Sequence, residues 1–377
     1  MRIAMLGQKG IPATFGGVEK HVEEISTRLA ARGHKVTVFT RPYYLREAFE
    51  RRVRPSYLIS PNGLQVNLLP SLPTKHLDAF SHTLLGTLHS LAREYDLLHY
   101  HGLGPATLSI LPKFLRKKIV ITVHGLAWQS DKWNQLAKIY LKWGERVSAR
   151  IPDSLVVVSQ SLKTYFQDKY HCKTIYIPNG VNLPFLNGNQ GVEFLRSRGL
   201  KEKEYILFVG RLVPEKGVHL LLEAFRNLKT EKKLVIAGGS SYSDDYVREL
   251  QNRTDPSVVF CGYVYGEELD SLYRDAYLCV FPSLLEGMPL TLLEALSYGQ
   301  AVLASDIPEH REVLKDQGAY FHSQSAADLS EKLKLLLSDK NSFPGNQSTR
   351  RDLVAQNFSW DKAVDALETI YREVLKN

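Results

Sequence analysis

The strongest constraint on the fold is a repeated order of short apolar runs and amphipathic segments. The first repeat has a strand at residues 2–6, a helix at 18–31 that stops at Gly33, and a strand at 35–40. A matching repeat opens the second half, with strands at 205–209 and 233–237 around a helix at 218–228. Strands that alternate with helices are typical of parallel βαβ construction. Two similar openings in one chain therefore predict an α/β protein with two Rossmann-like domains in tandem.

The length of 377 residues also favours two domains, because a single hydrophobic core rarely grows that large. Residues 177–188 are dense in Pro, Gly and Asn, which is typical of a boundary. We therefore expect a first domain at residues 1–182 and a second at 183–359. The remaining residues, 360–377, have the pattern of a closing helix.

Charge is divided unevenly between the two halves. Residues 1–190 contain 25 Lys and Arg against 12 Asp and Glu, a net charge of +13, whereas residues 191–377 have a net charge of −5. A basic half beside an acidic half indicates an anionic partner for the first half.

Two stretches of the basic half, 111–118 and 132–150, mix apolar and cationic residues. Trp133, Leu136, Tyr140 and Trp143 fall near one helical face of the second stretch, and basic amphipathic helices of this kind lie on anionic membranes. A helix that packs this face on the core explains the pattern equally well. Both interpretations stay open.

The sequence gives few signs of targeting. No apolar run approaches the roughly 20 residues that span a bilayer, and the chain runs directly into the strand at 2–6. The three cysteines have no metal-ligand spacing, which suits a reducing compartment. We therefore expect no signal peptide and a cytoplasmic location.

Residues 286–294, Glu-Gly-Met-Pro-Leu-Thr-Leu-Leu-Glu, carry the most specific chemistry. Pro289 suits the first turn of a helix that Gly299 would end, and the free N–H groups of that turn form an anion site. Glu286 and Glu294 flank the turn and can accept hydrogen bonds from neutral hydroxyls. A phosphate beside polyhydroxyl rings describes a nucleotide sugar, although a solvated helix with two surface glutamates is the simpler alternative.

Two cations follow the strand at 205–209. Arg211 and Lys216 leave its carboxyl end through a turn that contains Gly and Pro, and ligands of parallel α/β sheets bind at that edge. Two fixed cations can neutralise a diphosphate without a metal. No Asp-x-Asp motif occurs near a strand end, so we expect no metal.

Paired glycines separate the first strand from the first helix. Gly16 and Gly17 allow backbone amides to approach a phosphate at the helix start, although a flexible loop would look the same. Gly7-Gln-Lys-Gly10 lacks the G-x-G-x-x-G fingerprint of dinucleotide-binding domains. This difference disfavours a dehydrogenase.

Histidines mark two neighbouring strand ends. His124 follows the apolar run at 119–123, so we expect it at the carboxyl edge of a central strand. His99 and His101 alternate along the strand-like segment 97–102, and we expect them to point to opposite faces, with His101 nearer the edge. A lone histidine at such a position is more often structural than catalytic.

Together these motifs resemble the retaining GT-B glycosyltransferases of family 4. The shared motifs appear in family order: Gly16-Gly17-Val18-Glu19, Val123-His124-Gly125, Val209-Gly210-Arg211 with Lys216, and the Glu286/Glu294 pair. The opening, residues 6–19, is similar to the bacterial branch often labelled rhamnosyltransferase.

The resemblance implies a GT-B fold, with two Rossmann-like domains facing each other across a cleft. The first domain would bind the acceptor, the second would bind a nucleotide sugar, and helix 360–377 would pack back onto the first. Catalytic roles fall on Arg211, Lys216, His124 and Glu286. The implied donor-binding residues are Gly16, Gly17, Gly210, Arg211, Lys216, Val264, Glu286, Gly287, Met288, Pro289, Leu290 and Glu294. Glu19 and His101 would lie on the acceptor side.

By the same resemblance, the protein moves a hexosyl or deoxyhexosyl group from a nucleoside-diphosphate sugar, without a cofactor or metal. The acceptor would be a saccharide on a polyprenyl diphosphate or another anionic carrier, in bacterial cell-surface polysaccharide synthesis. Peripheral contact with an anionic membrane is expected, and nucleic acid is not. Two rivals remain: a nucleotide-sugar epimerase or hydrolase of similar fold, and a non-enzymatic basic protein that binds membranes or polyanions.

Overall fold

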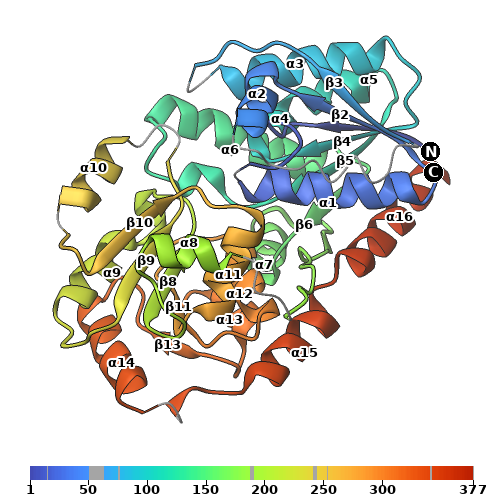
Figure 1. Cartoon of the computed structure of the whole chain (residues 1–377). Helices are drawn as coiled ribbons and strands as arrows, with labels where there is room; N and C mark the ends of the chain where they lie inside the picture. Colours follow the sequence, from blue (N-terminus) through green and yellow to red (C-terminus); the bar gives the residue numbers. More distant parts are fainter. Residues whose placement is uncertain are drawn as a thin grey trace. The chain divides into compact units, whose positions relative to one another are not determined.

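The chain folds as two compact units (Figure 1). The computed structural model describes residues 1–14, 16–50, 63–74, 77–186, 191–240, 244–252, 254–339 and 342–376. One unit contains Met1–Asn179 and Trp360–Asn377, and the other contains Gly180–Ser359. Each unit has one parallel sheet with helices around it, as the alternating pattern predicts.

The first unit is built on a seven-stranded sheet with the order β3-β2-β1-β4-β5-β6-β7. Its strands are β1 (Arg2–Leu6), β2 (Lys35–Thr40), β3 (Leu64–Leu68), β4 (Leu97–His101), β5 (Lys118–Val123), β6 (Ser154–Val157) and β7 (Ile175–Tyr176). Its helices are α1 (Gly17–Ala31), α2 (Pro42–Glu50), α3 (Asp78–Leu91), α4 (Leu103–Ala106), α5 (Ile110–Phe114), α6 (Gln135–Arg150), α7 (Gln160–Tyr170) and α16 (Trp360–Lys376), with 3₁₀ turns η2 (Thr107–Ser109) and η3 (Ala127–Gln129). The order reverses between β1 and β4, the place where such sheets bind ligands.

The second unit repeats this plan with the order β10-β9-β8-β11-β12-β13. Its strands are β8 (Tyr205–Val209), β9 (Lys233–Ala237), β10 (Val258–Gly262), β11 (Leu278–Phe281), β12 (Val302–Ser305) and β13 (Ala319–Phe321). Its helices are α8 (Val192–Ser197), α9 (Val218–Arg226), α10 (Asp244–Asn252), α11 (Gly266–Asp275), α12 (Leu290–Ser297), α13 (Pro308–Leu314), α14 (Ala326–Ser338) and α15 (Gln347–Asn357), with the 3₁₀ turn η4 (Pro214–Lys216). Here the order reverses between β8 and β11.

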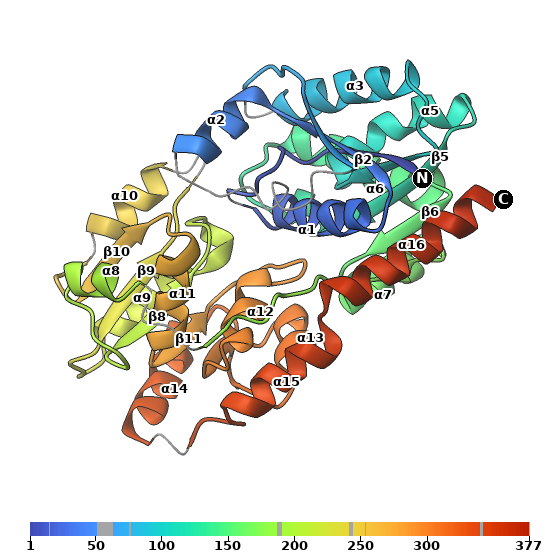
Figure 2. The ribbon, with the colours of Figure 1, turned by 45° about the vertical axis from the view of Figure 1, so that its right-hand side comes forward.

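The closing helix α16 is part of the first unit and lies beside α1 in both views (Figures 1 and 2). Arg28 Nε lies 3.1 Å from Asp361 Oδ1, and Arg32 lies 2.6 Å from Asp365 Oδ1. The opposite side of α16 buries Leu367, which has no exposed surface. Ion pairs on one face of α16 and apolar packing on another therefore hold this closing helix on the first unit.

The four strands predicted at 2–6, 35–40, 205–209 and 233–237 are confirmed to the residue. Their apolar runs are buried on both faces of a sheet, which makes them distinctive in the sequence. Helix α12 begins after Pro289, not with it in the first turn, because Pro289 has a non-helical ψ of 88°. Among the described residues, none of the helices is long and apolar enough to cross a membrane.

Candidate functional site

The loops that follow β8 and β11 meet at the carboxyl edge of the second sheet. Gly217 ends the turn η4 with a φ of +67°, and a Cβ there would lie 2.0 Å from the carbonyl oxygen of Pro282. The Leu284 N–H also donates to the Glu215 carbonyl at 2.8 Å. This close approach brings the cations after β8 beside the acidic segment after β11.

Lys216 and Glu286 form a largely buried ion pair at this edge. The Lys216 ammonium contacts Glu286 Oε1, and their side chains are 17% and 9% exposed. The Ser283 hydroxyl donates to the same oxygen at 2.8 Å. Burial alone would raise the pKa of Glu286, but the charge of Lys216 and these two hydrogen bonds hold it below its ordinary value. Glu286 is therefore ionised at neutral pH.

His310 is a further member of this site that the sequence analysis did not select. It is fully buried on α13, and its Nδ1 lies 3.0 Å from both the Oγ and the carbonyl oxygen of Ser305. Burial lowers the pKa of His310 to about 4, although the nearby Glu286 carboxylate opposes that shift. His310 comes five residues after the end of β12, so the rule that pointed to Arg211 could have found it.

Other residues predicted for the donor occupy the same edge with different exposure. Arg211 is exposed and follows Gly210, whose N–H donates to the Ala237 carbonyl of β9 at 3.0 Å. Val264, after β10, and Met288, before α12, are 7% and 8% exposed. Gly287, Pro289 and Leu290 complete the segment that leads into α12.

Glu294 lies on α12, eight residues after Glu286, and is held from α11. The Tyr273 hydroxyl donates to Glu294 Oε2 at 3.1 Å, and the Tyr273 ring stacks on Tyr298 with 5.4 Å between centroids. These contacts fix the position of one carboxylate oxygen. Gly299, just beyond α12, has a φ of +72° and ends the helix as predicted.

In the first unit, the glycines between β1 and α1 form a loop that acidic side chains tie to the helix. Gly16 is the N-cap of α1, and a Cβ there would lie 2.1 Å from Glu19 Oε2. Glu19 Oε1 accepts from the Lys9 N–H at 3.0 Å, and Glu23 Oε2 accepts from the Ala13 N–H at 3.1 Å. Glu19, predicted for the acceptor side, thus shapes the loop itself.

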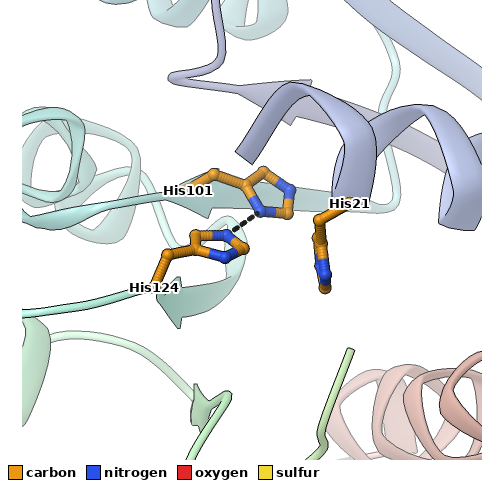
Figure 3. A group of neighbouring side chains, drawn as sticks. All are labelled: His21, His101 and His124. Atoms are coloured by element: carbon orange, nitrogen blue, oxygen red, sulfur yellow. Dashed lines mark hydrogen bonds between the residues drawn. The ribbon is translucent and has the colours of Figure 1, made fainter. Parts of the chain in front are cut away.

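Three imidazoles gather at the carboxyl edge of the first sheet (Figure 3). His101 ends β4 and His124 follows β5, and His101 Nδ1 lies 3.2 Å from His124 Nε2. His21, from α1, brings its ring centroid within 4.6 Å of that of His124. Asn179 Oδ1 accepts a hydrogen bond from His21 Nδ1 at 2.7 Å. Burial lowers the pKa of His21 to about 4 and the pKa values of His101 and His124 below their ordinary range.

His21 and Asn179 are not among the residues that the sequence motifs predict. His21 lies on α1 four residues after Gly17, which places it one helical turn from the loop. Asn179 belongs to the segment read as a domain boundary, yet it is only 3% exposed. Nothing local in Pro-Asn-Gly shows that its amide reaches a histidine 158 positions away.

The expectation that His99 and His101 point to opposite faces is wrong. Their ring centroids lie 4.2 Å apart, because residues two positions apart on a strand share a face. His99 Nδ1 pairs with the Tyr371 hydroxyl of α16 at 2.6 Å and its Nε2 pairs with Thr122 Oγ1 at 2.7 Å. His99 is therefore a structural neighbour that backs His101.

The apolar residues of the amphipathic stretch at 132–150 do not share one environment in the structure. Trp133 precedes α6, and the Tyr140 hydroxyl turns inward to the Gly104 carbonyl at 2.9 Å. Leu136, Ile139 and Trp143 remain 78%, 63% and 46% exposed. In the shorter stretch, Phe114 of α5 is 81% exposed and Leu115 is 58% exposed.

Two sequence families match this chain, one in each half. Residues 15–185 match Glycosyltransferase Family 4, and residues 193–360 match the glycosyl transferases group 1. O-antigen chain mannosyltransferase C of Escherichia coli is 25% identical over 100% of both chains. The E. coli UDP-Gal:alpha-D-GlcNAc-diphosphoundecaprenol alpha-1,3-galactosyltransferase is 26% identical, over 75% of this chain and 77% of its own length.

The fold comparison agrees with these matches. The crystal structure of Anabaena Alr3699/HepE in complex with UDP-glucose superimposes with a TM-score of 0.80, at 18% identity, over 99% of this chain and 100% of that one. Both parallel-sheet units are covered, which confirms the GT-B fold. The chain is a glycosyltransferase of the group 1/family 4 type.

Proposed function

We propose that this glycosyltransferase moves a hexosyl or deoxyhexosyl group from a nucleoside-diphosphate sugar to a lipid-linked saccharide, with retention and without a metal. The observation that carries the donor half of this proposal is the largely buried Lys216–Glu286 pair, at the point where the second sheet reverses its strand order. A cation for phosphate and a carboxylate for hydroxyls are thereby fixed in contact with each other.

The proposed step is a front-face substitution, in which the acceptor hydroxyl attacks from the side that the nucleotide leaves. The new glycosidic bond forms as the bond between the sugar and the diphosphate breaks, and a diphosphate oxygen takes the acceptor proton. Negative charge develops on the departing diphosphate, where Arg211 and Lys216 stabilise it. A lysine ammonium has three donors, so Lys216 can keep its contact with Glu286 while it binds a phosphate oxygen.

Glu286 is suited to hold the hydroxyls of the transferred sugar. Its contacts with Lys216 and Ser283 both fall on Oε1. The second oxygen, Oε2, can then accept from a sugar hydroxyl while the pair stays intact. The N–H groups at the start of α12 add donors beside it.

Glu294 is proposed to hold the ribose hydroxyls, so Glu294→Gln should weaken donor binding more than turnover. We expect the donor KM to rise by about 10-fold with kcat within about 2-fold, because a charge-assisted hydrogen bond is lost equally from ground and transition states. Steady-state kinetics with the donor varied measures this. Glu331→Gln, at an exposed position of α14, is the control. A fall in kcat with an unchanged KM would contradict the assignment.

In the first unit, His124 and His101 mark the edge that we assign to the sugar and the acceptor, and Gly16 and Gly17 keep their predicted role as phosphate-binding amides. The glycines follow β1 and His101 ends β4, the two strands between which the order reverses, and His124 follows the neighbouring β5. A Cβ at Gly7, in the loop after β1, would lie 2.6 Å from the His101 carbonyl, which shows how closely the two loops approach.

The lipid-linked acceptor is supported by the relatives and by charge. One similar enzyme is named for a diphosphoundecaprenol substrate and another for O-antigen chain synthesis. The excess of Lys and Arg in residues 1–190 suits an anionic carrier. We propose a role in the synthesis of bacterial surface polysaccharide on the cytoplasmic side of the membrane.

The exposed apolar face of α6 is the proposed membrane contact. Leu136→Ser with Ile139→Ser should lower binding to anionic phospholipid vesicles by at least about 10-fold, because two side chains that are 78% and 63% exposed lose their apolar surface. Sedimentation with vesicles measures it. Leu335→Ser, which removes a leucine that is 55% exposed on α14 of the second unit, is the matched control. Equal binding by all three proteins would exclude α6 as the contact.

The proposed activity is tested by incubating the protein with a panel of nucleotide sugars in EDTA, with and without bacterial lipid extract. Mass spectrometry should find one sugar added to a lipid, with release of the matching nucleotide. Turnover only after Mg²⁺ or Mn²⁺ is added back would refute metal independence. An isomerised or hydrolysed donor in the absence of lipid would indicate an epimerase or hydrolase instead.

A further inference from the structure

One ring nitrogen of the histidine cluster, His21 Nε2, is buried and has no hydrogen-bond partner among the described residues. Leaving a buried polar group unpaired is unfavourable, so this atom calls for an explanation. One nitrogen from each of His21, His101 and His124 lies within 4.8 Å of one from each of the others.

We propose that His21, His101 and His124 form a binding site for one borderline divalent transition-metal ion such as Zn²⁺. Three histidines are a well-known ligand set for zinc sites that keep a fourth position for water or another ligand. Imidazole also suits Cu²⁺ and Ni²⁺, whereas Mg²⁺ and Ca²⁺ prefer oxygen ligands. The site therefore favours a transition metal over Mg²⁺ and Ca²⁺.

The spacing of two ligands already fits such an ion. Tetrahedral Zn²⁺ with bonds of about 2.0–2.1 Å places its nitrogens roughly 3.3 Å apart. His101 Nδ1 and His124 Nε2 lie 3.2 Å apart. Binding would exchange their hydrogen bond for two coordination bonds, and the His21 ring would move in to complete the set (Figure 3).

The orientation of His21 is set by a neighbour outside the ligand set. Asn179 Oδ1 can only accept, so His21 Nδ1 carries the hydrogen and the lone pair is on Nε2. A hydrogen bond of this kind from the second ring nitrogen is typical of metal-ligating histidines. Asn179 therefore acts as a positioning residue for the third ligand.

The three rings differ in how exposed they are. His21 and His101 are each 1% exposed, whereas His124 is half-buried. An ion would therefore enter past His124.

The consequence for activity rests on the role proposed for His124. Coordination would engage the ring that we assign to the transferred sugar. The ion would then act as a reversible inhibitor of an enzyme that turns over without metal.

The binding test uses Co²⁺, whose visible absorption reports a low-coordinate nitrogen site, added to protein dialysed against EDTA and then against metal-free buffer. We expect one Co²⁺ per chain and its displacement by one Zn²⁺. His21→Gln and His101→Gln should each weaken Zn²⁺ binding by at least about 100-fold, and Asn179→Ala by about 10–100-fold. His171→Asn is the matched control, since His171 is exposed and Asn tolerates its φ of 51°.

Melting temperatures of the metal-free proteins verify that each variant folds, and the rise caused by Zn²⁺ gives a second measure of binding. Absence of the Co²⁺ absorption, or equal affinity in wild type, His21→Gln, His101→Gln and Asn179→Ala, would overturn the site. Zn²⁺ should inhibit transfer by the wild type and EDTA should restore it. Metal binding by a protein without transferase activity would instead refute the proposed reaction and leave the metal site standing.

Discussion

Replacing Lys216 by Ala should lower kcat by about 100-fold or more, with a smaller change in the donor KM. The expected loss is that of a preorganised electrostatic group which acts on charge developing in the transition state. Lys216 is suited to this role because its side chain is only 17% exposed and Glu286 fixes its ammonium. Single-turnover measurements with saturating donor separate this effect on chemistry from product release.

The same variant should change the pH dependence of the residual activity. Lys216 is one cause of the lowered pKa of Glu286, and burial opposes it, so removal of the lysine raises that pKa. If the ionised carboxylate is required, activity is then lost at a higher pH than in the wild type as the pH falls. The rate-against-pH profile of both proteins between pH 4 and about pH 9 measures the shift.

Two further variants distinguish a loss of catalysis in Lys216→Ala from a folding defect. Lys201→Ala removes a lysine of the same unit whose side chain is 79% exposed, and it should leave kcat unchanged. Lys216→Ala combined with Glu286→Gln avoids leaving a buried carboxylate without its cation, so the double variant should recover stability but not turnover. Wild-type kcat in a folded Lys216→Ala protein would remove Lys216 from the mechanism.

The α/β architecture and the donor-side residues of the second unit could be predicted because both depend on local sequence patterns. Fully buried apolar runs fix the strands, and the carboxyl ends of parallel strands share one edge, which brings Arg211 and Lys216 toward Glu286. The direct ion pair could not be predicted, since it joins residues 70 positions apart through the close contact between Gly217 and Pro282. His310 was missed because no motif names it.

The first unit shows where local patterns fail. Its three-histidine cluster draws on a helix and two strand ends, and it depends on an asparagine in a segment that has the composition of a linker. The orientation of His99 was misjudged although a two-residue strand period settles it. The strand-end position indicated His101 and the resemblance gave His124 its role, but only the three-dimensional structure adds His21 to them.

Glu145 carries the largest expected effect on stability in the first unit. It lies on α6 with no exposed surface. Lys169 Nζ lies 2.7 Å from Glu145 Oε1, and the hydroxyl of Tyr165 donates to the same oxygen at 3.0 Å. Tyr170 and the indole of Trp128 donate to the carboxylate as well. A single buried charge thereby joins α6, α7 and the turn η3.

Glu145→Gln should destabilise the first unit by about 3 kcal/mol at pH 7, which corresponds to a fall of roughly 6–12 °C in its melting temperature. The amide has no charge to attract the Lys169 ammonium, and it presents N–H groups to neighbours that are themselves donors. Burial would raise the pKa of Glu145, but its four hydrogen bonds hold that pKa below its ordinary value. Its contribution is therefore full above about pH 5 and is lost as the pH falls through the lowered pKa.

Calorimetry of wild type and Glu145→Gln at several pH values tests both parts of this expectation. The difference between the two melting temperatures should be largest at pH 7 and should shrink below about pH 4, where the wild-type carboxyl takes up a proton. Glu94→Gln is the matched control, because Glu94 is 85% exposed and its pair with Arg2 at 2.6 Å is a surface ion pair worth under about 1 kcal/mol. Equal small effects of the two substitutions would show that the buried Glu145 carboxylate contributes no more to stability than a surface ion pair does. A pH-independent loss would instead assign the effect to altered side-chain packing around α6, with no contribution from the charge of Glu145.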